Sequence, residues 1–199
     1  MSQYFETIRI EEGKIFNISY HQSRFEKTRA ECLGLKSHES LEQLIRVPER
    51  FSKGLVRCRI SYGQQIEEIA YTPYERKIIN SLKVVFSDSI TYPYKYSDRS
   101  QLSALYDLKG SCDDILIVRQ GEFTDSYVAN AVFWSGQEWH TPLHPLLPGT
   151  MRASLLDQGA IKAEIITTEV LPAYRKIKLI NAFHTLDEAP ELDLEALKY

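Results

Sequence analysis

A predicted helix that carries an arginine on its apolar face constrains this chain more than any other feature of the sequence. Ser19 and Gln22 form a Ser-x-x-Gln capping box and Gly34 is a typical helix stop, which predicts a helix over residues 19–33. One face of this helix collects residues at spacings of three and four: His21, Arg24, Phe25, Thr28 and Cys32. Because an unpaired buried charge is very unfavourable, Arg24 needs an anion. Either Arg24 snorkels or pairs with a structural carboxylate, or its planar fork binds a phosphate or carboxylate.

The order of the other elements predicts an α+β protein with two lobes. Residues 54–63 alternate, which predicts a strand with Arg57 and Arg59 on the face opposite its apolar side chains. The first lobe, residues 1–90, is expected to contain a hairpin, two helices and three strands, in the segments 4–20, 19–33, 37–47, 54–63, 67–74 and 81–88. The second lobe, residues 91–199, is expected to contain helices in 99–110 and 146–159 and strands in 113–123, 129–142, 162–170 and 175–183. Residues 87–100 form a candidate linker, and the acidic tail 186–199 is expected on the surface.

Composition narrows the class of protein. With 199 residues, 43% of them hydrophobic, the chain can bury a sizeable core, and its net charge of −3 gives no basic surplus for nucleic-acid binding. The cysteines Cys32, Cys58 and Cys112 are far apart without a CxxC pair, which indicates a reducing compartment. No secretory signal is visible, and no apolar run approaches the roughly 20 residues of a membrane helix. We therefore expect a cytoplasmic protein with no membrane segment.

Three further places carry polar residues with two interpretations each. Arg57 and Arg59 are either a solvated strand face or, if that face lines a cleft, carboxylate readers. Gly149 and Thr150 precede a predicted helix, so they form either an ordinary cap or an anion site at its N-terminus. Asp125 lies between two predicted strands, where it forms either an Asx-type turn or a carboxylate that keeps a ring nitrogen protonated.

A single lysine, Lys95, stands among tyrosines in the segment "YPYKY" that begins at Tyr92. It is either an ordinary solvated side chain or an amine held for chemistry. The sequence has no HExxH, GxSxG or Walker-type pattern. Metal chemistry and triad chemistry therefore receive no support.

Taken in order, these motifs resemble the fold-type IV pyridoxal-phosphate enzymes, the class-IV aminotransferase family. The matching segments cover almost the whole chain: "FETIRI…GKIFNISYHQSRFEKT", "RCRISYG", a lysine, "G-x-x-x-D-S-x-x-x-N" and "TP…LLPGTMR". Within the family, the motifs at Lys95 to Arg99, at 149–152 ("GTMR") and at 180–182 ("INA") are most similar to those of 4-amino-4-deoxychorismate lyases. The resemblance implies a two-lobed α+β fold with the cofactor cleft between the lobes, a homodimer, and a small amino compound as substrate.

The resemblance also implies roles for individual residues. Lys95 would be the catalytic residue and would bond covalently to pyridoxal 5′-phosphate. The cofactor would be bound by Arg24, Asp125, Ser126, Gly149 and Thr150. Carboxylates of the substrate would be read by Arg57, Arg59 or Arg99.

Three functions follow from this resemblance. The first is a lyase that converts 4-amino-4-deoxychorismate to 4-aminobenzoate and pyruvate in folate synthesis. The second is an aminotransferase acting on branched-chain or D-amino acids, and the third is a catalytically silent relative that acts as a binding protein. The chain departs from the family pattern by lacking an N-terminal segment ahead of "FET", by having Asp125 instead of a glutamate, and by having Ser100 where aminotransferases often have tyrosine. The serine favours the lyase or a silent relative.

Overall fold

The computed structural model describes residues 3–36 and 39–199, and these residues form two compact units. The first unit comprises the chain up to Arg76 together with Tyr94–Asp98. The second unit comprises the rest of the described chain from Lys77 onward, so the chain passes between the units more than once.

This division differs from the lobes 1–90 and 91–199 expected from the sequence. The strand Leu82–Phe86 pairs in parallel with Asp114–Arg119, a strand of the second unit, so it belongs there. Tyr96, in contrast, forms an antiparallel bridge with Tyr4 of the first unit. Strand partners distant in sequence therefore decide the division, and Lys95 belongs to the first unit.

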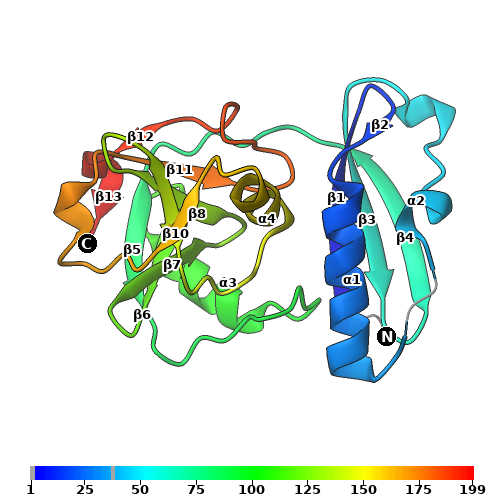
Figure 1. Cartoon of the computed structure of the whole chain (residues 1–199), viewed down its shortest axis with the longest axis horizontal. Helices are drawn as coiled ribbons and strands as arrows, with labels where there is room; N and C mark the ends of the chain where they lie inside the picture. The colour runs from blue at the N-terminus through cyan, green and yellow to red at the C-terminus, as the bar shows by residue number, and fades with distance from the viewer. Residues whose placement is uncertain (1–2, 37–38) are drawn as a thin grey trace. The chain divides into compact units, whose positions relative to one another are not determined.

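Among the described residues, the first unit combines an antiparallel sheet, one long helix and two short helical segments. They are β1 (Tyr4–Glu11), β2 (Lys14–Ile15), α1 (Ile18–Leu33), α2 (Leu41–Leu44), η1 (Glu49–Phe51), β3 (Leu55–Tyr62) and β4 (Ile66–Pro73). The strands follow the order β2-β1-β3-β4, and α1 runs along one face of the sheet (Figure 1). Ile8, Ile60 and Tyr62 pack with Phe25 of α1 in the core of this unit. The alternation predicted for β3 is confirmed.

Helix α1 confirms the predicted helix but begins differently. It ends at Gly34, whose φ of 67° lets its amide donate to the carbonyl of Ala30. The predicted capping box is wrong, because Asn17 is the N-cap, in a left-handed conformation without a side-chain cap bond. Ser19 already lies inside the first turn, where its carbonyl accepts from the Ser23 hydroxyl. Of the second predicted helix, residues 37–38 lie outside the described residues, and the rest is reduced to the short α2.

Part of the expected linker pairs with the start of β1 in the first unit. The Phe5 amide donates to the carbonyl of Lys95 at 3.0 Å, and the Ser97 amide donates to the carbonyl of Gln3 at 2.8 Å. Tyr94 and Tyr96 on either side of the lysine pack against the hydrophobic core of the first unit. Backbone pairing and aromatic packing therefore hold the lysine-bearing segment beside β1.

The second unit is built around a large mixed sheet. Its elements are β5 (Leu82–Phe86), α3 (Ser100–Tyr106), η2 (Asp107–Lys109), β6 (Asp114–Arg119), β7 (Glu122–Ser126), β8 (Asn130–Trp134), β9 (Trp139–Pro142), α4 (Thr150–Asp157), β10 (Lys162–Glu164), η3 (Leu171–Ala173), β11 (Lys176–Ile180), β12 (Leu192–Asp193), η4 (Leu194–Ala196) and β13 (Leu197–Lys198). The strand order is β10-β9-β8-β7-β6-β5-β13, with β11 also paired to β8 and β12 paired to β11. The mixture of helices and sheets in both units agrees with the predicted α+β class.

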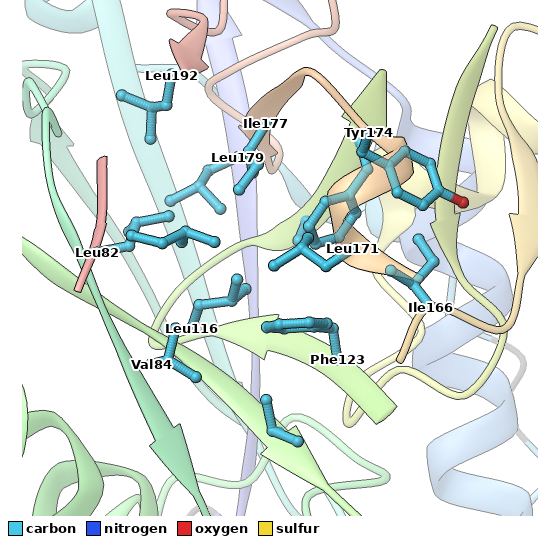
Figure 2. Packing of buried hydrophobic residues seen from close by; sticks show 14 of the residues in the cluster. Leu82, Val84, Leu116, Phe123, Ile166, Leu171, Tyr174, Ile177, Leu179 and Leu192 are labelled. Atoms are coloured by element: carbon cyan, nitrogen blue, oxygen red, sulfur yellow. The ribbon is translucent and has the colours of Figure 1, made fainter. Parts of the chain in front are cut away.

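The core of the second unit joins residues from distant parts of the chain. Leu82, Leu116 and Phe123 meet Ile177 and Leu192 in one cluster (Figure 2). Leu192 and Leu197 come from the acidic tail, which was expected on the surface, and both are buried. The tail expectation is wrong because apolar residues lie between the charged ones and pack into the core, and β13 pairs with β5.

We predict that the tail contributes measurably to stability. Leu192→Ala should lower the free energy of unfolding by about 2–4 kcal/mol, because a buried leucine is lost and a cavity remains. Leu108→Ala, at a position that is 58% exposed, is the matched control and should change it by less than about 1 kcal/mol. Urea unfolding followed by circular dichroism measures both. Equal effects for the two variants would contradict a structural role for the tail.

Candidate functional site

A buried carboxylate, Glu6, joins strand β1 to helix α1. Its Oε1 accepts from Nε of Arg24 at 2.9 Å, and its Oε2 accepts from Nη2 of Arg24 at 2.6 Å. Nδ1 of His21, three residues before Arg24, also lies 2.6 Å from Oε2. Glu6 is therefore the structural carboxylate that the first of the two alternatives predicts, and phosphate binding by Arg24 stays a prediction.

The three side chains set one another's protonation. Burial would raise the pKa of Glu6, but the charge of Arg24 and the hydrogen bonds from His21 and Arg24 lower this pKa to about 2. Burial lowers the pKa of His21, and the charges of Arg24 and Lys95 add to that effect, so the imidazole is neutral at pH 7. Glu6 therefore stabilises the fold above its unfolded pKa, and this contribution is lost as the pH falls toward 2.

Lys95 and Arg59 share one aromatic neighbour. Lys95 Nζ lies 4.8 Å from the centroid of the Phe5 ring, and the guanidinium carbon of Arg59 lies 3.9 Å from the same centroid. The Lys95 side chain is half-buried. Two of the residues predicted for the site, one catalytic and one substrate-reading, are thus brought together in the first unit.

The other two predicted substrate readers have different surroundings. Arg57, on the same strand as Arg59, is exposed, and its Nε donates to the Thr72 hydroxyl at 3.2 Å. Arg99 lies in the second unit, where its Nη2 donates to the carbonyl of Tyr127 at 2.5 Å and its guanidinium lies over the Tyr127 ring. Arg99 therefore holds the turn that follows Asp125.

In the second unit, Asp125 is the centre of a network of neutral hydrogen-bond donors. Nδ2 of Asn130 donates to Asp125 Oδ1 at 2.8 Å and to the carbonyl of Leu147 at 2.9 Å. The amide of Leu147 donates to Asp125 Oδ2 at 2.8 Å. Asp125 and Asn130 lie opposite each other where β7 meets β8. The network ties the end of β7 to the loop that leads into α4.

Gly149, the N-cap of α4, has no side chain and so leaves room for the Asn130 side chain of this network. Its φ of −72° suits any residue, but an added Cβ would lie 2.0 Å from Asn130 Oδ1. Thr150 follows it as the buried first residue of α4. The glycine is therefore required by the approach of Asn130 and not by the backbone conformation.

Burial raises the pKa of Asp125 to about 6, although hydrogen bonds from Leu147 and Asn130 and the charge of Arg152 oppose this rise. Arg152 itself is buried and donates to the Pro142 carbonyl at 2.9 Å. Ser126, also buried, has its hydroxyl oxygen 3.1 Å from the Ala129 amide and accepts from it, so it shapes the turn after Asp125.

Across residues 3–36 and 39–199, no three His, Cys, Asp or Glu side chains are grouped so that they could hold a metal ion. Over the same residues, no helix has both the length and the apolar character needed to span a membrane.

Comparison with known proteins gives the family. No protein-family model matches the chain. An uncharacterized protein of Haemophilus influenzae is 40% identical over 188 residues, which are 94% of this chain and 100% of the relative. A crystal structure from Haemophilus somnus 129PT, titled a "putative 4-amino-4-deoxychorismate lyase", is 40% identical with a TM-score of 0.89 and covers 94% of this chain and 98% of its own. The chain belongs to the fold-type IV pyridoxal-phosphate enzymes.

At 15% identity and a TM-score of 0.74, a hypothetical aminotransferase from Mycobacterium tuberculosis in its PLP-bound form shares the fold over 96% of this chain and 80% of its own.

The fold-type IV chain carries the donor types that pyridoxal phosphate needs. Lys95 is an amine, and Arg24 is a guanidinium whose two bonds to Glu6 fix its plane. An arginine fork has five N–H donors, so a carboxylate on one edge does not exhaust it. Asp125 is a buried carboxylate that only neutral groups contact by hydrogen bonds in the described chain, which suits a protonated ring nitrogen. The residues of this fold-type IV enzyme fit the cofactor.

Four residues of these networks had no role in the sequence analysis: Glu6, His21, Asn130 and Arg152. A signal for Glu6 was present, because strand alternation puts it on the same face as Ile8 and Ile10, opposite a helix stripe that contains an arginine. The contact of Asn130 with Gly149 had no sequence signal, since it depends on how the loop before α4 returns to β8.

We predict that Gly149 and Asn130 are energetically coupled. Gly149→Ala should lower the free energy of unfolding by about 1–3 kcal/mol, because the new methyl group displaces the Asn130 side chain. In an Asn130→Ala background the collision is removed, and the same change should cost less than about 0.5 kcal/mol. A double-mutant cycle by urea unfolding measures this coupling. Equal costs in both backgrounds would show that the close approach is unimportant.

Asp125 should give stability a pH dependence in the cofactor-free protein. Its pKa of about 6 in the folded state lies above the ordinary 3.8, so the folded state binds more protons between these values. The free energy of unfolding of the wild type, relative to Asp125→Asn, should therefore fall between pH 4 and pH 7, by up to about 3 kcal/mol. Urea unfolding of both proteins at each pH measures the difference between their free energies of unfolding. Hydrogen bonds that Asp125→Asn loses shift this difference by the same amount at every pH, so they do not change its trend with pH. A difference that stays flat or rises with pH would refute the buried-carboxylate explanation.

Proposed function

We propose that this protein is a pyridoxal-phosphate-dependent lyase that converts 4-amino-4-deoxychorismate to 4-aminobenzoate and pyruvate. The observation that carries the proposal is the 40% identity, over nearly the full length of both chains, to the Haemophilus somnus protein titled as such a lyase. Ser100, at a position where aminotransferases of the family often have tyrosine, supports the same choice. We further propose that the protein acts as a cytoplasmic homodimer in folate synthesis, as the family resemblance implies.

Each residue has a proposed task. Lys95 Nζ would hold the cofactor covalently and, once the substrate amine has taken its place, would move a proton at the substrate carbon. Arg24 holds the phosphate together with the amides at Gly149 and Thr150, and Ser126 belongs to the same cofactor-binding set. Asp125 keeps the ring nitrogen protonated. The bound cofactor supplies an electron sink for the substrate carbon.

Among the proposed substrate readers, Arg59 has the strongest support. It shares the Phe5 ring with Lys95, so a carboxylate bound by Arg59 would lie near the reacting amine. Arg57 and Arg99 remain candidates with weaker support, since Arg57 bonds to Thr72 and Arg99 bonds to Tyr127. A doubly carboxylated substrate such as 4-amino-4-deoxychorismate could use more than one of them.

The second candidate function is that of an aminotransferase. The name of the Mycobacterium tuberculosis protein favours it, although a likeness at 15% identity supports the fold alone. In that reaction Lys95 would return the proton to the cofactor carbon and a keto acid would leave. A silent binding protein, the third possibility, would bind no cofactor covalently.

Cofactor attachment is tested first. Purified protein loaded with pyridoxal phosphate should be yellow, and borohydride should fix a pyridoxyl group that peptide mapping assigns to Lys95. Lys95→Arg keeps the positive charge but cannot form the bond, so it serves as the matched control and should carry no label. A wild-type protein that neither colours nor takes up the label would contradict enzyme function of this class.

Substrate choice is tested second. With 4-amino-4-deoxychorismate, the wild type should release pyruvate and 4-aminobenzoate in equal amounts, and Lys95→Arg should lower the rate by at least about a hundredfold, in line with the loss of a proton-transferring group. Lactate dehydrogenase coupling measures the pyruvate. Conversion of amino acids that depends on a keto acid, without pyruvate from 4-amino-4-deoxychorismate, would replace the lyase by the aminotransferase.

A further inference from the structure

We propose that a surface hollow on the second unit binds a zwitterionic aromatic compound, of the chemical class to which the aromatic amino acids belong. The hollow is lined by Trp134, Trp139, Lys176 and Glu191, and we call it the tryptophan hollow. It contains none of the residues assigned to the cofactor or to the substrate. The inference therefore goes beyond the proposed function and does not depend on it.

Strand register places three of the lining residues in one row. Trp139 of β9 lies opposite Trp134 of β8, and Trp134 lies opposite Lys176 of β11. Side chains at directly opposed positions point to the same face of a sheet. Asp193 of β12 continues the row, because it lies opposite Lys176. The sheet therefore brings two aromatic rings and charged groups of both signs to one face.

The two indoles form the aromatic wall of the tryptophan hollow. Their ring centroids are 5.3 Å apart, and their planes are inclined by 48°. Trp134 and Trp139 are both half-buried, and Trp139 also packs against the hydrophobic cluster that contains Met151 and Leu155 of α4. The hollow has a volume of about 310 Å³, at the low end of the range for small-molecule sites. These dimensions suit a ligand with a single aromatic ring.

The charged groups of the hollow balance one another. Lys176 forms an ion pair with Glu191, and Lys178 Nζ lies 3.6 Å from the second carboxylate oxygen of Glu191. The hydrogen bond and charge of Glu191, with the charge of Asp193, raise the pKa of Lys176. The hydrogen bond from Lys176 lowers the pKa of Glu191, so both groups are charged at pH 7. Two ammonium groups and two carboxylates favour a ligand that carries both signs over a plain anion or cation.

A zwitterionic ligand can use both members of the exposed ion pair. The side chains of Lys176 and Glu191 are 42% and 43% exposed, and an exposed pair contributes little to stability. The carboxylate of the ligand would pair with Lys176, its ammonium group would pair with Glu191, and its ring would pack against the indoles. Recognition therefore requires a ring and two opposite charges on one molecule.

A purely structural interpretation of these residues makes a different prediction. A cross-strand aromatic pair stabilises a hairpin by itself, and a surface ion pair can be inert. In that case no added compound changes the surroundings of the tryptophans in a saturable way. Selective binding of a zwitterion separates the two interpretations.

Tryptophan fluorescence of the cofactor-free full chain reports directly on the hollow, because the sequence has two tryptophans and both line it. L-Phenylalanine serves as the probe, with excitation at the red edge of the indole band, where the probe does not absorb. It should change the emission saturably, with a dissociation constant of about 1 mM or lower. 3-Phenylpropanoate lacks the ammonium group and phenethylamine lacks the carboxylate, so each should bind at least about fivefold more weakly.

Three variants assign the two charges of the ligand to their partners. Glu191→Gln should bind L-phenylalanine and 3-phenylpropanoate within about twofold of each other, because the partner of the ammonium group is lost. Lys176→Met should bind L-phenylalanine and phenethylamine within about twofold of each other, because the partner of the carboxylate is lost. Lys162→Met breaks another exposed ion pair, with Glu138, outside the lining of the hollow. It is the matched control and should keep the preferences of the wild type.

Four outcomes would overturn the inference. They are no saturable response to L-phenylalanine up to about 10 mM, equal affinity for all three compounds, wild-type preferences that persist in Glu191→Gln and Lys176→Met, and a dimer whose tryptophans acrylamide cannot quench. The last would assign the hollow to a contact between two copies of the chain. None of these outcomes bears on cofactor attachment, so failure of the inference leaves the proposed function standing.

Discussion

A carboxylate removed from water must be compensated, and in the first unit this requirement links strand to helix. Glu6 lies on a strand face otherwise lined by apolar side chains, and its charge persists only because Arg24 and His21 reach it from α1. The same requirement explains why an arginine occupies an otherwise apolar helix stripe. Strand register, helix rotation and the direction of the guanidinium are therefore specified together, and none can change without leaving a charge unpaired in the core.

The second unit contains a buried carboxylate, Asp125, whose pKa is shifted in the opposite direction from that of Glu6. Asp125 accepts hydrogen bonds from a backbone amide and an asparagine, and burial outweighs these bonds and the charge of Arg152. Its pKa therefore rises to about 6, whereas the pKa of Glu6 is lowered to about 2. Equal burial thus gives opposite shifts because the neighbours differ. An incompletely compensated anion can accept one additional positive group, which is the property we attribute to Asp125 in the proposed enzyme.

Patterns that depend on near neighbours could be predicted from the sequence. The period of β3, the stop of α1 at Gly34 and the inward face that contains Arg24 all follow from local chemistry, and the structure confirms them. The boundary between the two lobes could not be predicted, because it depends on the parallel pairing of β5 with β6. The burial of leucines in the acidic tail could not be predicted either. At the site, the order of motifs led to the fold-type IV family, but the roles of Glu6 and Asn130 needed the partners that only the folded chain brings to them. Asn130 appeared in a motif, yet its contact with Gly149 is a tertiary one.

The discontinuity of the first unit has a consequence for how the protein is made. Its last piece, Tyr94–Asp98, is separated from the rest by Lys77–Pro93, which belongs to the second unit. During synthesis, the strands β1, β2, β3 and β4 therefore leave the ribosome before the segment that lies beside β1. A fragment cut after Arg76 would keep Glu6 and its two partners but would lack the lysine. The amine is thus supplied by a later part of the chain, which returns to the first unit after Lys77–Pro93 has joined the second unit.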